Sequence, residues 1–197
     1  MDVSFIIDKL LKEQGGILRT ADAVKSGVSR TTLGNLVKSG KLERIAHGQY
    51  IRPDSMADEM YMLQQRSDKI IFSHETALFL HDMAERTPFM HSVTIPSDSK
   101  LSPILSEGCR VYYVKPELHE MGRCSVISKM GNDVFVYDAE RTICDILRSR
   151  SRIDSQTFAK AMKSYVARKG QNRNKLSEYA AAFHVTKLLR QYLEVLT

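Results

Sequence analysis

Apolar residues recur through residues 16–53 with the spacing of two short helices, and two short strands follow them. The helices are separated by a turn at Gly27, and the strands meet at His47-Gly48. The residues expected to cap the helices with a side-chain oxygen are Thr20 and Ser29. The expected buried positions are Ala21, Ala23 and Val24 in the first helix and Leu33, Leu36 and Val37 in the second. This order of elements predicts a winged helix-turn-helix.

The outward side of the second helix carries side chains that hydrogen-bond phosphates and base edges. A helix fits the major groove and its N-terminal residues reach deepest, so Ser29 to Thr32, with Asn35, are predicted to read bases. The hairpin is expected to lie along the DNA backbone or the minor groove. The predicted DNA-binding residues are Ser29, Arg30, Thr31, Thr32, Asn35, Lys38, Lys41, Arg44, His47 and Gln49. The alternative is a helix-turn-helix that contacts only protein, with a hairpin that supports the core.

After Pro53 the pattern changes, and a helix over residues 55–68 is expected to bridge two domains. Runs separated by Gly, Pro, Asn or Asp predict strands at 70–73, 91–97, 110–114, 124–128 and 134–138. Helices are expected at 75–81, 138–147, 154–168, 173–183 and 185–196. The sequence therefore predicts an α+β protein. A winged helix-turn-helix domain spans residues 1–54, and a mixed α/β domain with a helical C-terminal portion spans residues 55–197.

The composition is that of a folded protein rather than a disordered or membrane-spanning one. The chain has 197 residues, of which 43% are hydrophobic, enough for a sizeable core. Its three widely spaced cysteines indicate reduced intracellular thiols. No apolar stretch is long enough to span a bilayer, and residues 1–14 predict an amphipathic helix that lacks the cationic start of a signal peptide. We therefore expect a cytoplasmic protein with no membrane partner.

Positive charge is concentrated at both ends of the chain, whose net charge is +6. Residues 1–55 hold 9 Lys/Arg against 6 Asp/Glu, residues 56–137 hold 8 against 11, and residues 138–197 hold 12 against 6. A DNA-reading N-terminal domain alone does not explain this distribution. The candidate second basic surface is Lys160, Lys163, Arg168, Lys169, Arg173 and Lys175, with Phe158, Met162, Tyr165 and Val166 buried behind it. It can contact the DNA backbone or an acidic partner, and the alternative is a solvated helix face.

One short motif, Ser73-His74-Glu75, has the residue types of a catalytic triad. Neighbours in a strand or an early helix mostly point apart, whereas a triad needs its three groups to converge in space. Ser73 is instead expected to cap the helix that follows it. His81 and Asp82 lie nearby without changing this interpretation. We therefore assign no catalytic residue to this motif.

The sequence also gives no support for a cofactor or a metal ion. Asp98 and Lys100 form an acid-x-Lys fragment like that of metal-dependent nucleases, but no second carboxylate cluster accompanies it, so a loop is favoured. The histidines and cysteines lack metal-ligand spacing, and the chain has neither a GxxxxGK[ST] nor a GxGxxG motif. Asp138, Glu140 and Arg141 are interpreted as the start of a helix. The prediction is a protein that is not an enzyme, with no cofactor and no structural zinc.

Six segments along nearly the full length carry a family resemblance. They are Gly15-Gly16, the helix from Arg19 to Gly27, Lys41-Leu-Glu-Arg-Ile-Ala-His-Gly-Gln-Tyr, Phe72-Ser-His-Glu-Thr-Ala-Leu, Thr94-Ile-Pro and Asp138-Ala-Glu-Arg-Thr. In this order they resemble the AbiEi antitoxin family, the transcriptional regulators of type IV, abortive-infection toxin-antitoxin systems of phage defence. The resemblance implies an N-terminal domain that represses its own operon through inverted repeats on double-stranded DNA. It also implies a C-terminal domain that counteracts a nucleotidyltransferase-like toxin, and can do so without a stable complex.

Two other functions stay open. One is a winged-helix-tethered enzyme that acts on nucleic acid or on the toxin. The lack of a set of catalytic residues in the sequence argues against this function. The other is a DNA-binding regulator without a toxin, whose C-terminal domain only dimerises or senses a ligand. The apolar positions of the last helix fit either a core face or a dimer face. They are Val185, Leu188, Leu189, Tyr192, Leu193 and Leu196.

Overall fold

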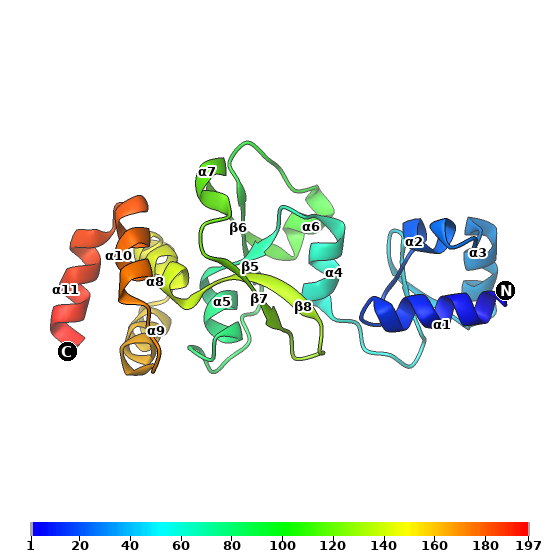
Figure 1. Cartoon of the computed structure of the whole chain (residues 1–197), viewed down its shortest axis with the longest axis horizontal. Coiled ribbons are helices and arrows are strands. Elements are labelled where there is room, and N and C mark those ends of the chain that lie inside the picture. The colour runs from blue at the N-terminus through cyan, green and yellow to red at the C-terminus, as the bar shows by residue number, and fades with distance from the viewer. Residues whose placement is uncertain (1, 197) are drawn as a thin grey trace. The chain divides into compact units, whose positions relative to one another are not determined.

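The computed structural model describes the backbone of residues 2–196 and the side chains of residues 2–194. The chain forms two compact units. The first unit is Met1–Met62 with Lys129–Asn132, and the second is Leu63–Ser128 with Asp133–Thr197. Each unit combines helices with a sheet, so the predicted α+β class is confirmed (Figure 1).

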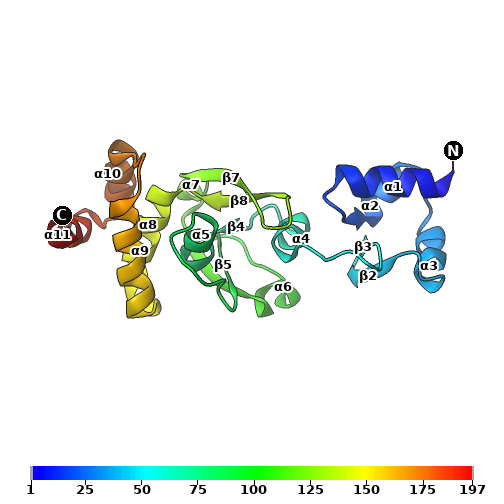
Figure 2. The ribbon, with the colours of Figure 1, turned by 90° about the horizontal axis from the view of Figure 1, so that it is seen from below.

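The first unit follows the predicted order of helices and strands. Its elements are α1 (Val3–Glu13), β1 (Leu18–Arg19), α2 (Thr20–Lys25), α3 (Arg30–Lys38), β2 (Glu43–Ala46) and β3 (Gln49–Ile51). β3 lies between β1 and β2 and is antiparallel to both. Figure 2 shows the three helices and the β2–β3 hairpin as one group of elements. The two-residue strand β1 is an addition to the prediction, because so short a run carries no periodicity.

A small apolar core holds the first unit together. It consists of Ile7, Leu10, Leu11, Leu18, Ala23, Val28, Leu33 and Leu42, with Leu36, Val37 and Tyr50 packed against it. Two predicted core positions are wrong, since Ala21 is exposed and Val24 is 46% exposed. The reason is that α2 has only six residues and buries Ala23 alone.

The two helix caps predicted in the first unit have different outcomes. Ser29 caps α3 as expected, because its Oγ accepts a hydrogen bond from the Thr32 N–H at 3.0 Å. Thr20 is wrong as a cap, because it is the first residue inside α2. The start of α2 is held instead by Arg19, whose Nε donates to the Asp22 carboxylate at 2.6 Å.

The rest of the chain holds most of the predicted strands and helices. Its elements are α4 (Glu59–Arg66), β4 (Ile71–Phe72), α5 (His74–Leu80), β5 (His91–Pro96), α6 (Pro103–Glu107), β6 (Cys109–Val114), α7 (Pro116–His119), β7 (Arg123–Ile127), β8 (Asp133–Tyr137), α8 (Ala139–Arg148), α9 (Ser155–Ala167), α10 (Arg173–Ala182) and α11 (Thr186–Leu196), with a 3-10 turn at Arg150–Arg152. The helix predicted over residues 55–68 is shorter than expected. It begins at Glu59, because the Asp58 carboxylate accepts the Tyr61 N–H at 3.1 Å and fixes the start there.

The sheet of the second unit has the strand order β6-β5-β4-β8-β7. β5 is parallel to β6 and β4 is parallel to β8, while the other two neighbouring pairs are antiparallel. The central strand β4 has only two residues, and the side chain of Gln64 continues its pairing with β8. The Gln64 amide donates to the Phe135 carbonyl at 2.7 Å and accepts the Phe135 N–H at 2.8 Å. This side chain therefore satisfies a strand edge that would otherwise be open.

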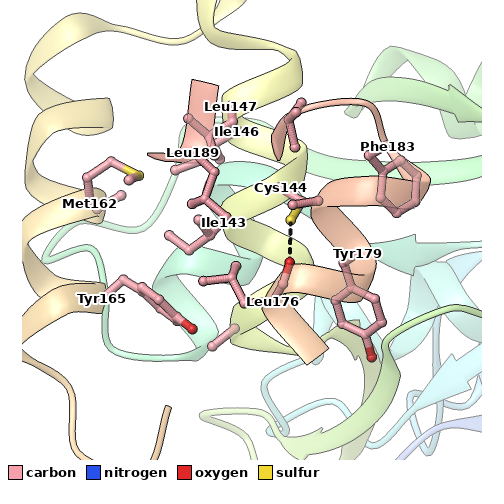
Figure 3. Close-up of a cluster of buried hydrophobic side chains, with 14 of the residues drawn as sticks. Ile143, Cys144, Ile146, Leu147, Met162, Tyr165, Leu176, Tyr179, Phe183 and Leu189 are labelled. Atoms are coloured by element: carbon pink, nitrogen blue, oxygen red, sulfur yellow. Dashed lines mark hydrogen bonds between the residues drawn. The ribbon is translucent and has the colours of Figure 1, made fainter. Parts of the chain in front are cut away.

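The main core lies among α5 and the helical group formed by α8–α11. α8 contacts α5, α9, α10 and α11. Figure 3 shows its apolar side chains, among them Ile143 and Ile146, meeting those of the neighbouring helices. Val185, just before α11, and Leu189 of α11 are buried, and Leu188, Tyr192 and Leu193 pack against the same core. These described positions are therefore core positions, while the Leu196 side chain lies outside the described residues.

No helix in the described part of the chain is both long and apolar enough to cross a membrane.

Candidate nucleic-acid interface

One stripe of α3 presents polar side chains away from the core of the first unit. With about 3.6 residues per turn, Thr31, Asn35 and Lys38 fall on the same side of the helix, opposite the fully buried Leu33. All three are exposed, and so is Arg30 at the first helical position. The side chains that can reach a major groove are thus a guanidinium, a hydroxyl, an amide and an ammonium group.

Two of the predicted base-reading hydroxyls are used in the helix start itself. The Ser29 Oγ caps α3 and lies 2.8 Å from the Thr32 Oγ1. Thr32 is half-buried, whereas Ser29 is exposed. These two residues therefore set the position of the helix N-terminus, and a phosphate placed there would meet free backbone N–H groups.

The β2–β3 hairpin places some predicted contacts on the surface and removes one. Lys41, Arg44 and His47 are exposed, and the Arg44 Nη2 lies 3.2 Å from the His47 Nδ1. The prediction for Gln49 is wrong, because its side chain is only 3% exposed and its Nε2 donates to the Met62 carbonyl at 3.4 Å. Gln49 belongs to the middle strand of its sheet, where its side chain points into the unit.

Ion pairs leave part of the positive charge of the first unit uncompensated. Arg19 is neutralised by Asp22 at 2.6 Å, and Arg52 forms an ion pair with Asp8. The basic residues without a carboxylate partner among the described residues include Arg30, Lys38 and Lys41. Part of this uncompensated charge lies on α3 and the loop after it, where it can attract a polyanion.

Comparison with family models identifies this segment. Residues 6–53 match the model of a transcriptional regulator, AbiEi antitoxin. This segment is similar to AbiEi antitoxin regulators. The predicted family resemblance is confirmed over this segment, which contains α2, α3 and the β2–β3 hairpin.

Most of the chain is similar in fold to a solved structure. The crystal structure of the RV2827C protein from Mycobacterium tuberculosis superposes with a TM-score of 0.66 at 11% sequence identity. The match covers 91% of this chain and 71% of the mycobacterial chain. At this identity the likeness concerns the fold alone. The comparison with curated proteins gave no match.

Outside residues 6–53, the six residues of the predicted second basic surface are all exposed. Lys160 pairs with Glu85 at 2.5 Å, and Lys175 pairs with Asp138 at 3.3 Å. The residues of this set without a carboxylate partner in the described part of the chain are Lys163, Arg168, Lys169 and Arg173. Residues 155–177 contain no Asp or Glu. The positive charge here is therefore largely uncompensated, although two of its six residues are neutralised.

The loop between α9 and α10 gives this surface a fixed shape. The Gln171 Nε2 donates to the carbonyls of Tyr165 at 2.6 Å and Val166 at 2.8 Å, which lie in the last turn of α9. The Asn172 side chain caps α10 by accepting the Lys175 N–H at 3.0 Å. A hollow of about 670 Å³ lies against this loop, with Arg168 and Arg173 in its lining.

The segment Asp138-Ala-Glu-Arg-Thr starts α8, as the sequence predicts, and it also joins three helices. Asp138 caps α8, and its other carboxylate oxygen accepts from Lys175 and from the Tyr179 hydroxyl at 3.2 Å. Burial, with Asp138 beside it, raises the pKa of Tyr179 to about 12, so this hydroxyl stays protonated and donates. Glu140 accepts from the Tyr165 hydroxyl at 3.3 Å. The motif thereby ties α8 to α9 and α10.

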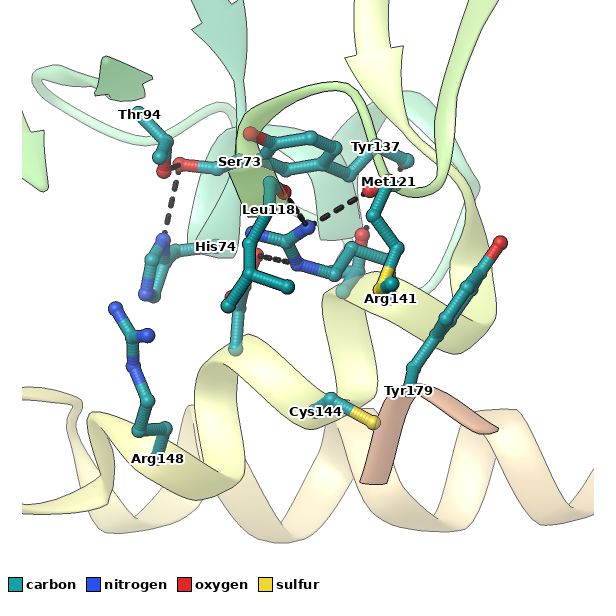
Figure 4. Close-up of polar contacts among 12 residues, drawn as sticks. Ser73, His74, Thr94, Leu118, Met121, Tyr137, Arg141, Cys144, Arg148 and Tyr179 are labelled. Carbon is teal, nitrogen blue, oxygen red and sulfur yellow. Dashed lines mark hydrogen bonds and ion pairs between the residues drawn. The ribbon is translucent and has the colours of Figure 1, made fainter. Parts of the chain in front are cut away.

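Arg141 of this motif is fully buried, which the sequence does not predict. Its Nε lies 3.1 Å from the Asp145 carboxylate, and its Nη1 donates to the carbonyls of Leu118 at 3.0 Å and Met121 at 2.7 Å. Figure 4 shows the guanidinium directed at this turn, close to Tyr137, whose ring centroid lies 4.0 Å from the Arg141 Cζ. Arg141 therefore fixes the turn that leads into β7.

The residues Ser73, His74 and Glu75 do not converge as a triad. The Ser73 Oγ lies 2.9 Å from the His74 Nδ1, but Glu75 points elsewhere, to Arg110 at 2.7 Å. His74 is fully buried and its Nε2 lies 3.1 Å from the Ser149 Oγ (Figure 4). The predicted cap role of Ser73 is wrong, because its side chain makes no cap bond. This cluster links α5 to the end of α8.

The buried His74 makes stability depend on pH. Burial lowers its pKa well below the usual value of 6.5, and the Arg148 guanidinium lowers it further. Because the unfolded chain binds the proton more readily, His74 contributes stability that is present above about pH 6.5 and is lost as the pH falls towards the folded-state pKa. The loss is up to about 1.4 kcal/mol per pH unit.

We therefore expect His74→Gln to have a shallower loss of unfolding free energy between about pH 7 and pH 5 than the wild type. Urea unfolding at a series of pH values measures it. Equal pH slopes in the two proteins would show that His74 takes up no proton on unfolding in this range.

The acid-x-Lys fragment lies in a turn after β5, as expected. The Asp98 carboxylate accepts from the Ser99 hydroxyl at 3.1 Å, and that hydroxyl in turn accepts from Lys69 at 3.0 Å. Within the described residues, no group of three or more His, Cys, Asp or Glu could hold a metal ion.

Proposed function

We propose that the protein is the antitoxin of a type IV, abortive-infection toxin-antitoxin system of phage defence and the repressor of its own operon. In this proposal residues 1–54 act as a winged helix-turn-helix, with α3 in the major groove of an inverted repeat and the β2–β3 hairpin as the wing. Residues 55–197 form the antitoxin domain, which counteracts a nucleotidyltransferase-like toxin in the cytoplasm and does not need a stable complex to do so.

The observation that carries the DNA-binding part is the exposed stripe of α3. Arg30, Thr31 and Asn35 have the donor and acceptor groups that read base edges. Each is exposed, Arg30 and Thr31 at the start of α3 and Asn35 about one turn further along. The residues assigned to phosphates are Lys38, Lys41, Arg44 and His47, with Ser29 and Thr32 setting the helix N-terminus. The match of residues 6–53 to AbiEi transcriptional regulators supports the same role.

A reporter driven by the DNA upstream of the protein's own gene tests repression. We expect the wild type to lower expression and the double variant Thr31→Ala/Asn35→Ala to restore it, because each lost base contact costs about 1–3 kcal/mol of discrimination. Lys12→Ala is the matched control, since Lys12 is exposed on α1, away from the stripe. Full repression by the double variant would contradict the assignment of α3.

Co-expression with the product of the neighbouring gene tests the antitoxin part. We expect the neighbour alone to arrest growth and the full-length protein to restore it. The Thr31→Ala/Asn35→Ala variant should restore growth equally well, because the antitoxin function is assigned to residues 55–197. A neighbour without toxicity, or rescue that disappears together with DNA binding, would contradict this division of roles.

We also propose that the second basic surface adds phosphate contacts when the protein binds DNA. Each neutralised phosphate lowers the slope of log K against log salt by about 0.9. The double variant Lys163→Gln/Lys169→Gln should therefore reduce the slope by about two units, as measured by fluorescence anisotropy on the same DNA. Lys160→Gln is the control, because Glu85 already pairs with Lys160. An unchanged slope in the double variant would make this surface a solvated helix face.

A further inference from the structure

A second hollow of about 670 Å³ opens within the second unit, away from the loop between α9 and α10. The connection from α5 to β5, residues 83–90, forms one wall. Residues 152–160, which include the first turns of α9, form another wall. Ser92 of β5 and Arg110 of β6 lie between the two walls. No residue of this hollow belongs to either basic surface described above except Lys160.

The carboxylates of this hollow are already occupied by partners within the chain. Glu75 accepts from Arg110 at 2.7 Å and from the Ser92 hydroxyl at 2.9 Å. Glu85 pairs with Lys160 at 2.5 Å. The remaining carboxylate, that of Asp154, caps α9 by accepting a backbone N–H at 2.8 Å. These acids are therefore poor sites for a cation.

Two guanidinium groups of the same hollow remain without a carboxylate in the described part of the chain. Arg86 is exposed in the α5–β5 connection. Arg152 is also exposed, and its Cζ lies 4.4 Å from the ring centroid of Tyr112, so stacking on this ring holds the guanidinium in place. The hollow thus offers two arginines that can each take a carboxylate in a bidentate pair.

The same hollow is also lined by solvent-exposed apolar side chains. Phe89 is 103% exposed and Met90 is 37% exposed, and both line the hollow. A large aromatic side chain left in water next to a cavity is typical of a protein interaction site, where aromatic and Arg side chains supply most of the binding energy.

We propose that this hollow binds an acidic segment of a partner protein that carries a large apolar side chain. Carboxylates of the segment pair with Arg86 and Arg152, and its apolar side chain packs on Phe89 and Met90. The lining has four basic residues against three acidic ones, a net charge of +1. That balance suits a few carboxylates better than a polyphosphate or a nucleic-acid strand, whose dense charge exceeds what two unpaired arginines can neutralise.

The test uses the full-length protein and a labelled copolymer of glutamate and tyrosine in the ratio of about four to one, which combines both recognised groups. By fluorescence anisotropy, Arg152→Glu and Phe89→Ser should each weaken binding about tenfold, as truncation of an interface anchor does. Polyglutamate, which lacks the aromatic group, should also bind about tenfold more weakly. The matched control is Lys163→Glu/Lys169→Glu, which should change affinity less than about twofold, because these residues lie outside the hollow.

Three results would overturn the proposal. Loss of copolymer binding in the Lys163→Glu/Lys169→Glu control would place the acidic ligand on the second basic surface. Tighter binding of inorganic polyphosphate or single-stranded DNA than of the copolymer, with sensitivity to Arg152→Glu, would make the hollow a phosphate site. Unchanged copolymer affinity in both Arg152→Glu and Phe89→Ser would exclude the hollow. The proposal does not rest on DNA repression, so it stands or falls separately from the role of α3.

Discussion

Replacing Arg141 by Met is expected to lower the free energy of unfolding of the second unit by about 3–5 kcal/mol, the usual cost of breaking a buried ion pair from one side. The guanidinium is 0% exposed and the Asp145 carboxylate 1% exposed, with 3.1 Å between them. Without Arg141, Asp145 keeps a buried charge that has lost its cation. The carbonyls of Leu118 and Met121 lose their donor as well.

Urea unfolding followed by far-UV circular dichroism measures this effect. The double variant Arg141→Met/Asp145→Leu should recover part of the loss, because it removes both charges together. Arg190→Met is the matched control, since Arg190 is exposed on α11 and its replacement should change stability by less than about 0.5 kcal/mol. A loss below about 1 kcal/mol for Arg141→Met would show that the junction at the start of α8 does not depend on this ion pair.

The second large effect is expected for Arg30, the exposed first residue of α3. Arg30→Ala should weaken binding to the DNA upstream of the protein's own gene by about tenfold to a hundredfold, because one base contact supplies about 1–3 kcal/mol of discrimination. Binding to scrambled DNA should change much less. Sequence preference is therefore reduced while the salt dependence is largely retained.

Lys41→Ala provides the contrasting case, because Lys41 is assigned to a phosphate. It should weaken binding to both DNAs about equally and reduce the salt slope by about one unit. Anisotropy titrations over a salt series separate the two patterns, with Lys12→Ala as the control on α1. If Arg30→Ala and Lys41→Ala both leave promoter binding unchanged, α3 and its following loop do not face DNA.

The elements that sequence predicts well are those with a strong local signal. Ser29 and Asp138 each place a short polar side chain before an apolar helical pattern, and both cap the helix they were expected to start. Strands β5 and β6 and helices α9, α10 and α11 coincide with clear periodic runs of apolar residues in the sequence. In these cases the local preference and the tertiary packing favour the same structure.

The failures arise where tertiary packing decides the environment of a side chain. Gln49 is a polar residue of a type usually found on the surface. Its side chain is nevertheless buried, because it lies on the middle strand of the small sheet and points into the unit. Val24 is an apolar residue of a type usually found in the core, yet its side chain is 46% exposed because α2 is short. Arg141 is buried because the Asp145 carboxylate and a distant turn converge on it, and no spacing in the sequence indicates that turn.

The hollow that contains Phe89 escapes sequence analysis for a related reason. Its walls come from the α5–β5 connection, residues 83–90, and from residues 152–160 at the start of α9, which are far apart along the chain. The signal that the sequence does hold is the aromatic residue in a short segment with Thr87 and Pro88, outside any periodic run. Only the folded arrangement brings that residue beside Arg152.

Promoter binding by the full-length protein is the sharpest test of the proposal that α3 reads DNA. Fluorescence anisotropy with the DNA upstream of the protein's own gene is compared with scrambled DNA of the same composition over a salt series. We predict a preference of at least about a thousandfold for the promoter, as sequence-specific regulators show, and a steep fall in affinity with salt. Equal affinity for both DNAs, or absent binding at low salt, would contradict the account.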